Sequence, residues 1–249
     1  MNPIVVIPAR MAAHRLPGKP LAEIGGVAMI VRVLRCAEAA GVGPAMVAAG
    51  APEIVAAVEA AGGRAILTDP ALPSGSDRVV AALATLDPER RHDVVINLQG
   101  DMPFIEPAVL TACLRLLEDE SACDIATCVA AESSAGDRDS PDVVKAVLAM
   151  TDDGRCGRAL YFTRSTLWGD GPVWRHVGVY AYRRDALARY TAAPPSPLER
   201  REKLEQLRAL ELGQSIWAAV IDGAPISVDT PADLEAARRH AAEHQDQHR

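Results

Sequence analysis

Basic side chains gather in a loop-forming stretch directly after the first apolar run of the chain. The stretch IPARMAAHRLPGKPL carries Arg10, Arg15 and Lys19. Guanidinium and ammonium groups suit phosphate oxygens, and Gly18 lets the backbone approach a ligand closely. The spacing matches neither the Walker A loop nor the GxGxxG turn, which disfavours those two modes of nucleotide binding. We therefore predict a local anion site rather than a solvated basic loop.

Two aspartates follow later apolar runs. Asp101 lies in LQGDMP, after the run at 93–98, and Asp229 lies in VDTP, after the run near 225–228. Magnesium is usually held by one or two carboxylates together with substrate phosphates. We expect Asp101 to bind a divalent cation, with Asp229 as its partner. An aspartate before Thr-Pro is also a common helix cap, and the spacing leaves both roles open for Asp229.

The segment SGSDR is a weaker candidate for nucleotide recognition. Ser74, Gly75 and Arg78 enter a predicted helix N-terminus, where backbone N–H groups suit a base or a phosphate. An ordinary helix cap at Ser76 explains the same letters equally well.

Polar residues of the second half carry no role by pattern alone. His176 and Tyr180 share one face of a predicted strand, which is typical of a half-buried histidine beside structural tyrosines. Arg164, Glu205 and Gln206 fit a solvated polar face.

The elements that must position these residues alternate between short β-branched runs and amphipathic stretches. As far as residue 131 the alternation predicts an α/β fold with βαβ units and a mainly parallel sheet flanked by helices. In such a sheet ligands bind beyond the carboxyl ends of the strands, where Arg10, Asp101 and Asp229 all fall. The predicted strands are 3–8, 44–50, 64–68, 92–100 and 123–131, and the predicted helices are 27–41, 51–63, 76–86 and 106–120.

After residue 131 the alternation breaks. A polar loop at 131–142 precedes two predicted strands that are joined by an irregular segment at 158–174. No linker divides the chain, so we expect a single domain over 1–245, with parts at 1–130, 131–215 and 216–245. The predicted elements of this half are strands 143–150, 176–184, 215–221 and 224–228, a helix over 196–213, and a closing helix over 230–244 that is capped by Thr230.

Composition excludes several classes of partner. The chain has 249 residues, 49% of them hydrophobic, and a net charge of −7, so a general attraction to nucleic acid is not expected. Five cysteines form no CxxC pair and indicate buried thiols in a reducing compartment. No signal-peptide core and no run long enough to span a bilayer is found, which predicts a cytoplasmic protein without membrane insertion.

Several blocks occur together in the order typical of one family. These are IPARMAAHRLPGKPL, SGSDR, LQGDMPFI, VVKAV, ALYFTR, RHVGVYAYRR, PPSPLERREKLEQLR and VDTPADLE. With them the chain resembles the 3-deoxy-manno-octulosonate (Kdo) cytidylyltransferases from about residue 4 to residue 238. The resemblance implies a Rossmann-like nucleotidyltransferase sheet with a smaller elaboration for substrate binding and dimerisation, and usually a homodimer. It further implies transfer of CMP from CTP to Kdo, with release of pyrophosphate, for lipopolysaccharide assembly.

The resemblance also assigns roles to residues. It implies Mg²⁺ at Asp101 and Asp229, in-line attack of the anomeric hydroxyl of Kdo on the α-phosphate, and a catalytic part for Lys19. The implied nucleotide ligands are Pro8, Ala9, Arg10, Arg15, Lys19, Ser74, Gly75 and Arg78. The implied sugar-acid ligands are Gln99, Arg164, His176, Tyr180, Glu205 and Gln206.

Four features depart from the family pattern. The strand end VAAG at 47–50 lacks the acid that is often found there. Met102 stands where many members carry an acid, Asp142 stands where an amide is common, and His14 replaces a small hydroxylated residue in the basic loop. None of them is one of the implied metal or triphosphate ligands. Two alternatives stay open: a cytidylyltransferase for another acidic sugar, such as 8-amino-Kdo or a nonulosonate, and a nucleotide-binding homologue without catalysis.

Overall fold

The computed structural model describes residues 1–12, 15–132 and 138–245, which form two compact units. Unit 1 comprises Met1, Asp93–Ile96 and Ala108–Ala224. Unit 2 comprises Asn2–His92, Asn97–Pro107 and Pro225–Arg249. Unit 2 is therefore assembled from three separate stretches of the chain.

Unit 2 contains a parallel set of strands in the order β5-β4-β1. These are β1 (Pro3–Ala9), β4 (Ala45–Ala49) and β5 (Ala65–Leu67). All five residues of β4 are buried, as is typical of a parallel strand that is covered on both faces. A further strand, β6 (Val94–Leu98), has residues in both units. The predicted strands 3–8, 44–50 and 64–68 are confirmed.

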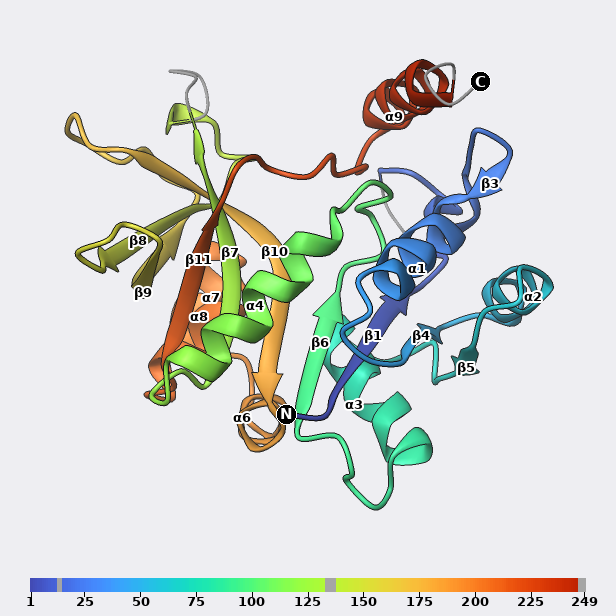
Figure 1. The fold of residues 1–249 in the computed structure, drawn as a ribbon, viewed down its shortest axis with the longest axis horizontal. Coiled ribbons are helices and arrows are strands. Elements are labelled where there is room, and N and C mark those ends of the chain that lie inside the picture. The colour runs from blue at the N-terminus through green and yellow to red at the C-terminus, as the bar shows by residue number, and fades with distance from the viewer. Residues whose placement is uncertain (13–14, 133–137, 246–249) are drawn as a thin grey trace. The chain divides into compact units, whose positions relative to one another are not determined.

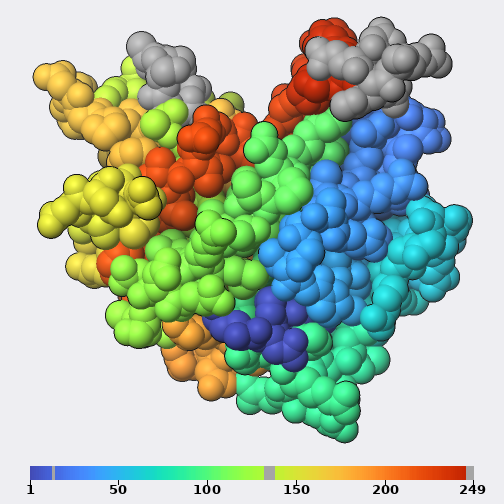
Figure 2. All heavy atoms as spheres, in the orientation of Figure 1, coloured from blue at the N-terminus to red at the C-terminus, as the bar shows by residue number. Residues whose placement is uncertain are grey.

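The helices of unit 2 begin and end where the sequence indicates. They are α1 (Met29–Ala39), α2 (Pro52–Ala60) and α3 (Gly75–Leu86). Gly41 and Gly62 follow α1 and α2 with φ of 62° and 81°, a left-handed conformation that favours glycine at a helix end. In Figure 2, α1 (blue) and α2 (cyan) are seen packed side by side.

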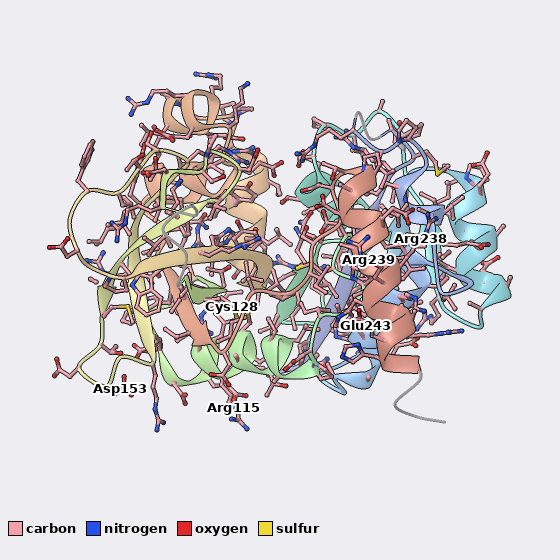
Figure 3. All side chains as sticks on the ribbon, turned by 90° about the horizontal axis from the view of Figure 1, so that it is seen from above. Arg115, Cys128, Asp153, Arg238, Arg239 and Glu243 are labelled. Atoms are coloured by element: carbon pink, nitrogen blue, oxygen red, sulfur yellow. The ribbon has the colours of Figure 1, made fainter. Side chains whose placement is uncertain are left out.

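A hairpin and the last helix complete unit 2. The 3-10 helix η1 (Lys19–Leu21) leads into the short strands β2 (Glu23–Ile24) and β3 (Val27–Ala28). Ile24 packs in one buried cluster with Val228 and with Leu234 of α9 (Pro231–Gln245). Arg238, which projects from α9 in Figure 3, donates from Nε to the carbonyl of Glu23 (2.9 Å).

Unit 1 contains a mixed sheet in the order β10-β7-β11-β9-β8, with a further β10–β8 pairing (Figure 1). Among the described residues of this unit, β7 and β11 pair in parallel, whereas β10–β7, β10–β8, β11–β9 and β8–β9 pair antiparallel. The arrangement is therefore less parallel than the alternation in the sequence predicts. The strands are β7 (Ile125–Glu132), β8 (Lys145–Met150), β9 (Cys156–Thr163), β10 (Val173–Arg183) and β11 (Ile216–Ile221).

One helix that was expected in unit 1 is divided in the structure. The expected helix over 196–213 is two short helices, because Lys203 between them adopts a left-handed conformation with φ of 57°. A capping box at Ser196 and Glu199 starts the first of them. The helices are α4 (Pro107–Asp119), α6 (Arg184–Ala192), α7 (Pro197–Glu202) and α8 (Gln206–Glu211).

Three further expectations are wrong. The segment 224–228 forms no strand, and the segment 158–174, expected to be irregular, contains most of β9 and the start of β10. The helix α6 was not anticipated. No helix in the described part of the chain is long and apolar enough to cross a membrane.

Candidate active site

One lysine of unit 2 lies between the two aspartates singled out in the sequence. Lys19 Nζ is 2.9 Å from Asp101 Oδ2 and 3.0 Å from Asp229 Oδ1. Arg15 Nη2 adds a second cation at 3.3 Å from Asp229 Oδ2. The structure thus brings together four predicted residues, of which Lys19 and Asp229 stand 210 positions apart in the chain.

The backbone explains how this cluster forms. Gly18 adopts φ of 70° just before η1, so the chain turns and Lys19 becomes the first residue of that helix. The N–H of Val228 donates to the carbonyl of Asp101 (2.9 Å). This bond joins the two aspartate-bearing segments directly, although they are remote in sequence.

The helix cap that competed for Asp229 is supplied by other residues. Thr230 Oγ1 accepts from the N–H of Asp233 (3.2 Å), and Asp233 Oδ2 accepts from the N–H groups of Asp229 (3.0 Å) and Thr230 (2.8 Å). These bonds form a capping arrangement at the start of α9. The Asp229 carboxylate is left to face Lys19 and Arg15, so its capping role is excluded.

The position between the two carboxylates suits a cation. Burial opposes the charged form of Lys19, but attraction by Asp101 and hydrogen bonds to both aspartates outweigh it and raise the pKa of the ammonium. No group of three or more metal-ligating side chains occurs among the described residues. Two carboxylates without further protein ligands match the way Mg²⁺ is held beside substrate phosphates.

The end of β1 packs tightly against two other loops. A side chain at Gly75 would meet Pro8 Cγ at 3.3 Å, and one at Gly100 would meet the Pro8 carbonyl at 3.3 Å. The Ala9 carbonyl accepts from the N–H of Gly50 (2.8 Å). Glycine at these positions therefore lets the N-terminus of α3 and the Asp101 loop approach the strand end closely.

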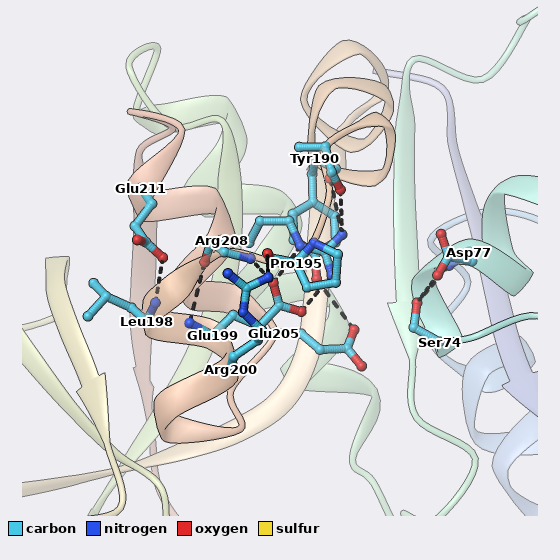
Figure 4. Close-up of polar contacts among 12 residues, drawn as sticks. Ser74, Asp77, Tyr190, Pro195, Leu198, Glu199, Arg200, Glu205, Arg208 and Glu211 are labelled. Atoms are coloured by element: carbon cyan, nitrogen blue, oxygen red, sulfur yellow. Dashed lines mark hydrogen bonds and ion pairs between the residues drawn. The ribbon is translucent and has the colours of Figure 1, made fainter.

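Of the SGSDR residues, Ser74 caps α3 and Arg78 is buried. Ser74 Oγ accepts from the N–H of Asp77 (3.1 Å) and donates to its carboxylate (2.6 Å), as drawn in Figure 4. Arg78 Nη1 donates to Thr68 Oγ1 (2.5 Å) and to the Asp69 carbonyl (3.0 Å). The cap predicted at Ser76 belongs instead to Ser74, and Arg78 holds the loop that follows β5.

Arg10 and Gln99 complete the predicted residues of unit 2. Arg10 is exposed just beyond β1. The pKa of Arg78 is lowered mainly by its own burial and further by repulsion from the charge of Arg10. Gln99 Nε2 donates to Asn97 Oδ1 (3.4 Å), and Asn97 in turn donates to Ser76 Oγ (3.5 Å). His14 lies outside the described residues, and Met102 is buried.

In unit 1, His176 and Tyr180 form part of an aromatic row. The His176 ring lies 5.1 Å from Phe162 and 5.3 Å from Tyr180, and its Nε2 is 3.0 Å from Thr127 Oγ1. Burial lowers the pKa of His176 to about 4, so the imidazole is neutral near pH 7. The expected common face of His176 and Tyr180 is confirmed.

A buried ion pair holds the segment that carries Glu205 and Gln206 (Figure 4). Arg208 donates to both carboxylate oxygens of Glu199, at 2.7 Å and 2.6 Å, and lies over the Tyr190 ring at 4.7 Å. Tyr190 OH donates to Glu205 (3.4 Å), and Gln206 is buried. The solvated face expected from the sequence is therefore wrong for Gln206.

Arg164 and a residue that the sequence did not single out lie at the end of β9. Arg164 Nη1 donates to the carbonyls of Pro141 (3.0 Å) and Asp142 (3.4 Å). Lys145 is fully buried and donates to the Arg164 carbonyl (2.7 Å). Its position in VVKAV, a charge inside an apolar run, is the signal that could have found it.

Comparisons with known proteins agree on one family. The Cytidylyltransferase family model matches residues 4–216. Proteins named 3-deoxy-manno-octulosonate cytidylyltransferase from Parvibaculum lavamentivorans and Rhodospirillum centenum are 57% and 56% identical over 238 residues, which cover 95% of this chain and 92% of each relative.

A solved structure agrees with this assignment. The structure of a CMP:2-keto-3-deoxy-manno-octonic acid synthetase complexed with CTP is 38% identical, with a TM-score of 0.89 over 98% of this chain and 100% of that one. The fold is thus the mixed α/β fold of a nucleotidyltransferase, and the chain belongs to the 3-deoxy-manno-octulosonate cytidylyltransferase family.

Proposed function

We propose that this enzyme transfers CMP from CTP to Kdo, giving CMP-Kdo and pyrophosphate for lipopolysaccharide biosynthesis. The observation that carries the proposal is the cluster of Lys19, Arg15, Asp101 and Asp229, which combines cations for phosphate with two carboxylates for a metal. Its substrates follow from the family, whose named members act on this sugar acid.

CTP would be bound by unit 2. Arg10, Arg15 and Lys19 supply donors for the triphosphate, and Gly75 at the start of α3 lets backbone N–H groups approach a phosphate. Pro8, Ala9, Ser74 and Arg78 shape this part of unit 2, as their contacts indicate. The parallel strands behind these residues support a Rossmann-like arrangement for this unit.

We assign Mg²⁺ to Asp101 and Asp229. When bound there, Mg²⁺ supplies charge for the phosphates and lowers the pKa of the attacking hydroxyl. The ammonium of Lys19 now lies between both carboxylates, so it must give up at least one of these bonds to reach a phosphate. A cation held by the same two side chains supports their assignment as metal ligands.

For the sugar acid, the proposed ligands are Gln99, Arg164, His176, Tyr180, Glu205 and Gln206. Arg164 offers a guanidinium to the carboxylate of the sugar, and the neutral His176 imidazole can accept or donate one hydrogen bond to a sugar hydroxyl. Tyr180, Glu205 and Gln206 add further hydrogen-bonding groups. The anomeric hydroxyl then attacks the α-phosphorus in line, its proton passes to solvent, and pyrophosphate leaves while Lys19 and Arg15 offset the growing charge.

A pyrophosphate-release assay with CTP tests the proposal. Purified enzyme, Mg²⁺ and CTP are combined with Kdo, 8-amino-Kdo or a nonulosonate, and the identity of the CMP-sugar is confirmed by mass spectrometry. Turnover is expected with Kdo and with CTP in preference to other nucleoside triphosphates. Turnover with only another acidic sugar would replace Kdo as the substrate, and CTP binding without turnover on any sugar would indicate a non-catalytic homologue.

We further propose that the chain acts as one nucleotidyltransferase over residues 1–245, as a homodimer in the cytoplasm. Trp168 is 93% exposed and Leu160 is 49% exposed, and both are in unit 1. The dimer itself follows from the resemblance to the family, and these two side chains are candidates for its interface. Light scattering after gel filtration measures the mass and tests the dimer.

A further inference from the structure

Lys145 is a buried cation that is held only by neutral groups. It begins β8, is 0% exposed, and donates from Nζ to the carbonyls of Ser140 (2.8 Å) and Arg164 (2.7 Å). Among the residues that the structure describes, no carboxylate forms an ion pair with this ammonium, and Asp139 acts on it only at longer range, where its charge raises the pKa of Lys145. Burying an unpaired ammonium is costly, so its retention in a core strand calls for a reason.

The side chain of Arg164 binds the same segment, which precedes β8, at the next two carbonyls. Its Nη1 donates to the carbonyls of Pro141 (3.0 Å) and Asp142 (3.4 Å). Lys145 and Arg164 therefore bind three successive carbonyls, of residues 140–142, and Lys145 also binds the backbone of Arg164 itself. We call this arrangement the carbonyl clasp; it consists of residues 140–142, Lys145 and Arg164.

The clasp leaves one edge of a guanidinium available. Within the described part of the chain, Nε and Nη2 of Arg164 have no acceptor, because both recorded side-chain bonds of this residue come from Nη1. A guanidinium edge with two parallel N–H groups matches a carboxylate in bidentate geometry. The pKa of Lys145 is lowered mainly by burial and further by the positive charge of Arg164. The two cations therefore lie close enough to repel each other. An anion at this edge would relieve that repulsion.

The clasp is also connected to His176. The N–H of His176 donates to the Val144 carbonyl (2.9 Å), one residue before Lys145, and Arg175 pairs with Lys145 across the β10–β8 ladder. Lys145 thus stands in the backbone network between two residues assigned to the sugar acid. Its displacement would shift the segment that carries Arg164, and all of these residues belong to unit 1.

We propose that Lys145 is a positioning residue for the carboxylate of the sugar: it fixes the backbone around Arg164, and its charge makes the site select anionic over neutral sugars. This inference rests on the proposed function and goes beyond it, because Lys145 touches no substrate in this role. It acts through the direction and the electrostatic surroundings of Arg164.

Steady-state kinetics of Lys145→Met test the proposal. We expect the KM for Kdo to rise at least about tenfold, with kcat and the KM for CTP changed less than about twofold, because binding of the sugar is weakened equally in the ground state and the transition state. Lys145→Arg keeps the charge and can donate to both carbonyls, so it should recover most of the affinity. Arg158→Met removes an exposed cation from β9, the strand that leads to Arg164, and is the control.

Two further measurements separate positioning from general structural damage. The C1 amide of Kdo lacks the negative charge, so Lys145→Met should narrow the preference of the enzyme for Kdo over this amide. In the double variant Lys145→Met, Arg164→Met, the KM for Kdo should equal that of Arg164→Met alone, because Lys145 acts through Arg164. If Lys145→Met does not fold, Lys145→Gln, which keeps one donor and loses the charge, takes its place in both measurements.

The outcomes distinguish this inference from the proposed function. If the wild-type enzyme turns over no acidic sugar, the proposed function fails. If it turns over Kdo and the KM for Kdo is unchanged in the charge-removing variant, or if the two substitutions act additively, the role of Lys145 is overturned while the function stands. An equal loss with Kdo and its amide would likewise overturn the selection of anions.

Discussion

Replacing Arg208 by Met tests how unit 1 holds its predicted sugar ligands. Arg208 and Glu199 form two parallel charge-assisted bonds of 2.6 Å and 2.7 Å, and their side chains are 8% and 10% exposed. Methionine keeps an apolar stem but removes the guanidinium. Glu199 is then left buried with an uncompensated charge.

The structure sets the size of the expected loss. Removing one partner of a buried ion pair costs about 3–5 kcal/mol, and the contact of Arg208 with the Tyr190 ring adds roughly 1 kcal/mol. Burial opposes ionisation of Glu199, but its bonds to Arg208 outweigh burial and lower the pKa of the carboxyl. We therefore expect the free energy of unfolding at pH 7 to fall by about 5 kcal/mol.

The pH dependence follows from the lowered pKa. A carboxyl with a depressed pKa in the folded state stabilises the protein above its ordinary value of 4.5, and this stability is lost as the pH falls through the folded pKa. The difference between wild type and Arg208→Met should therefore shrink below pH 4.5.

Urea unfolding followed by tryptophan fluorescence measures the loss. Trp168, Trp174 and Trp217 all belong to unit 1, so the signal reports that unit. Arg189→Met breaks an exposed ion pair with Asp124 and should cost less than about 1 kcal/mol, which makes it the matched control.

Two results would refute this account of the pair. A loss in Arg208→Met no larger than in Arg189→Met would show that the pair stabilises nothing. The double variant Glu199→Gln, Arg208→Met should recover part of the loss, since no buried charge remains, and a further large loss would contradict the stated cause.

Three other substitutions have defined outcomes. Burial lowers the pKa of His176 to about 4, so as the pH falls the unfolded chain takes up this proton before the folded protein does, and up to about 3 kcal/mol of stability is lost between pH 6.5 and 4. His176→Gln should flatten the dependence of the urea midpoint on pH in this range. An unchanged slope would contradict the role of His176. Asp101→Asn should lower kcat at least about 100-fold and raise the Mg²⁺ concentration needed for half-maximal rate, whereas Asp119→Asn, at an exposed position of α4, should do neither. Trp168→Ser should shift the mass measured by light scattering towards the monomer, and a mass unchanged at all concentrations would exclude Trp168 from the interface.

The sequence predicts unit 2 well because its signals are local. Gly41 and Gly62 mark helix ends, and the continuous apolar run of β4 marks a strand that is buried on both faces. Each of these features is decided by neighbours a few residues away. The cluster of Lys19 with Asp101 and Asp229 was anticipated because ligands gather beyond the carboxyl ends of parallel strands.

Unit 1 was predicted less well because tertiary pairing decides it. The leucine pattern of 196–213 favours one long helix, yet the left-handed Lys203 divides it and places Glu199 against Arg208. Strand β9 is not predicted because polar and apolar residues alternate only partly in its sequence, CGRALYFT. Its conformation is determined by pairing with β8 and β11.

Two features of the site could not be predicted from the sequence, because they also depend on tertiary contacts. The sequence indicates a helix cap at Thr230. Only the structure shows that Thr230 and Asp233 cap the helix without Asp229, whose carboxylate therefore faces Lys19. Lys145 is a single charge in an apolar run, and it binds backbone carbonyls. Because every residue has a backbone carbonyl, the sequence does not indicate which ones Lys145 contacts.

The bond from the N–H of Val228 to the carbonyl of Asp101 has a consequence for biosynthesis of the protein. Unit 2 takes its last stretch from residue 225 onward, after all of unit 1 has been made. A ribosome therefore releases the second carboxylate only after all of unit 1 has been synthesised. Until then a nascent chain carries the basic loop and Asp101 without Asp229, so a polypeptide that stalls or is truncated before residue 225 has an incomplete set of metal ligands.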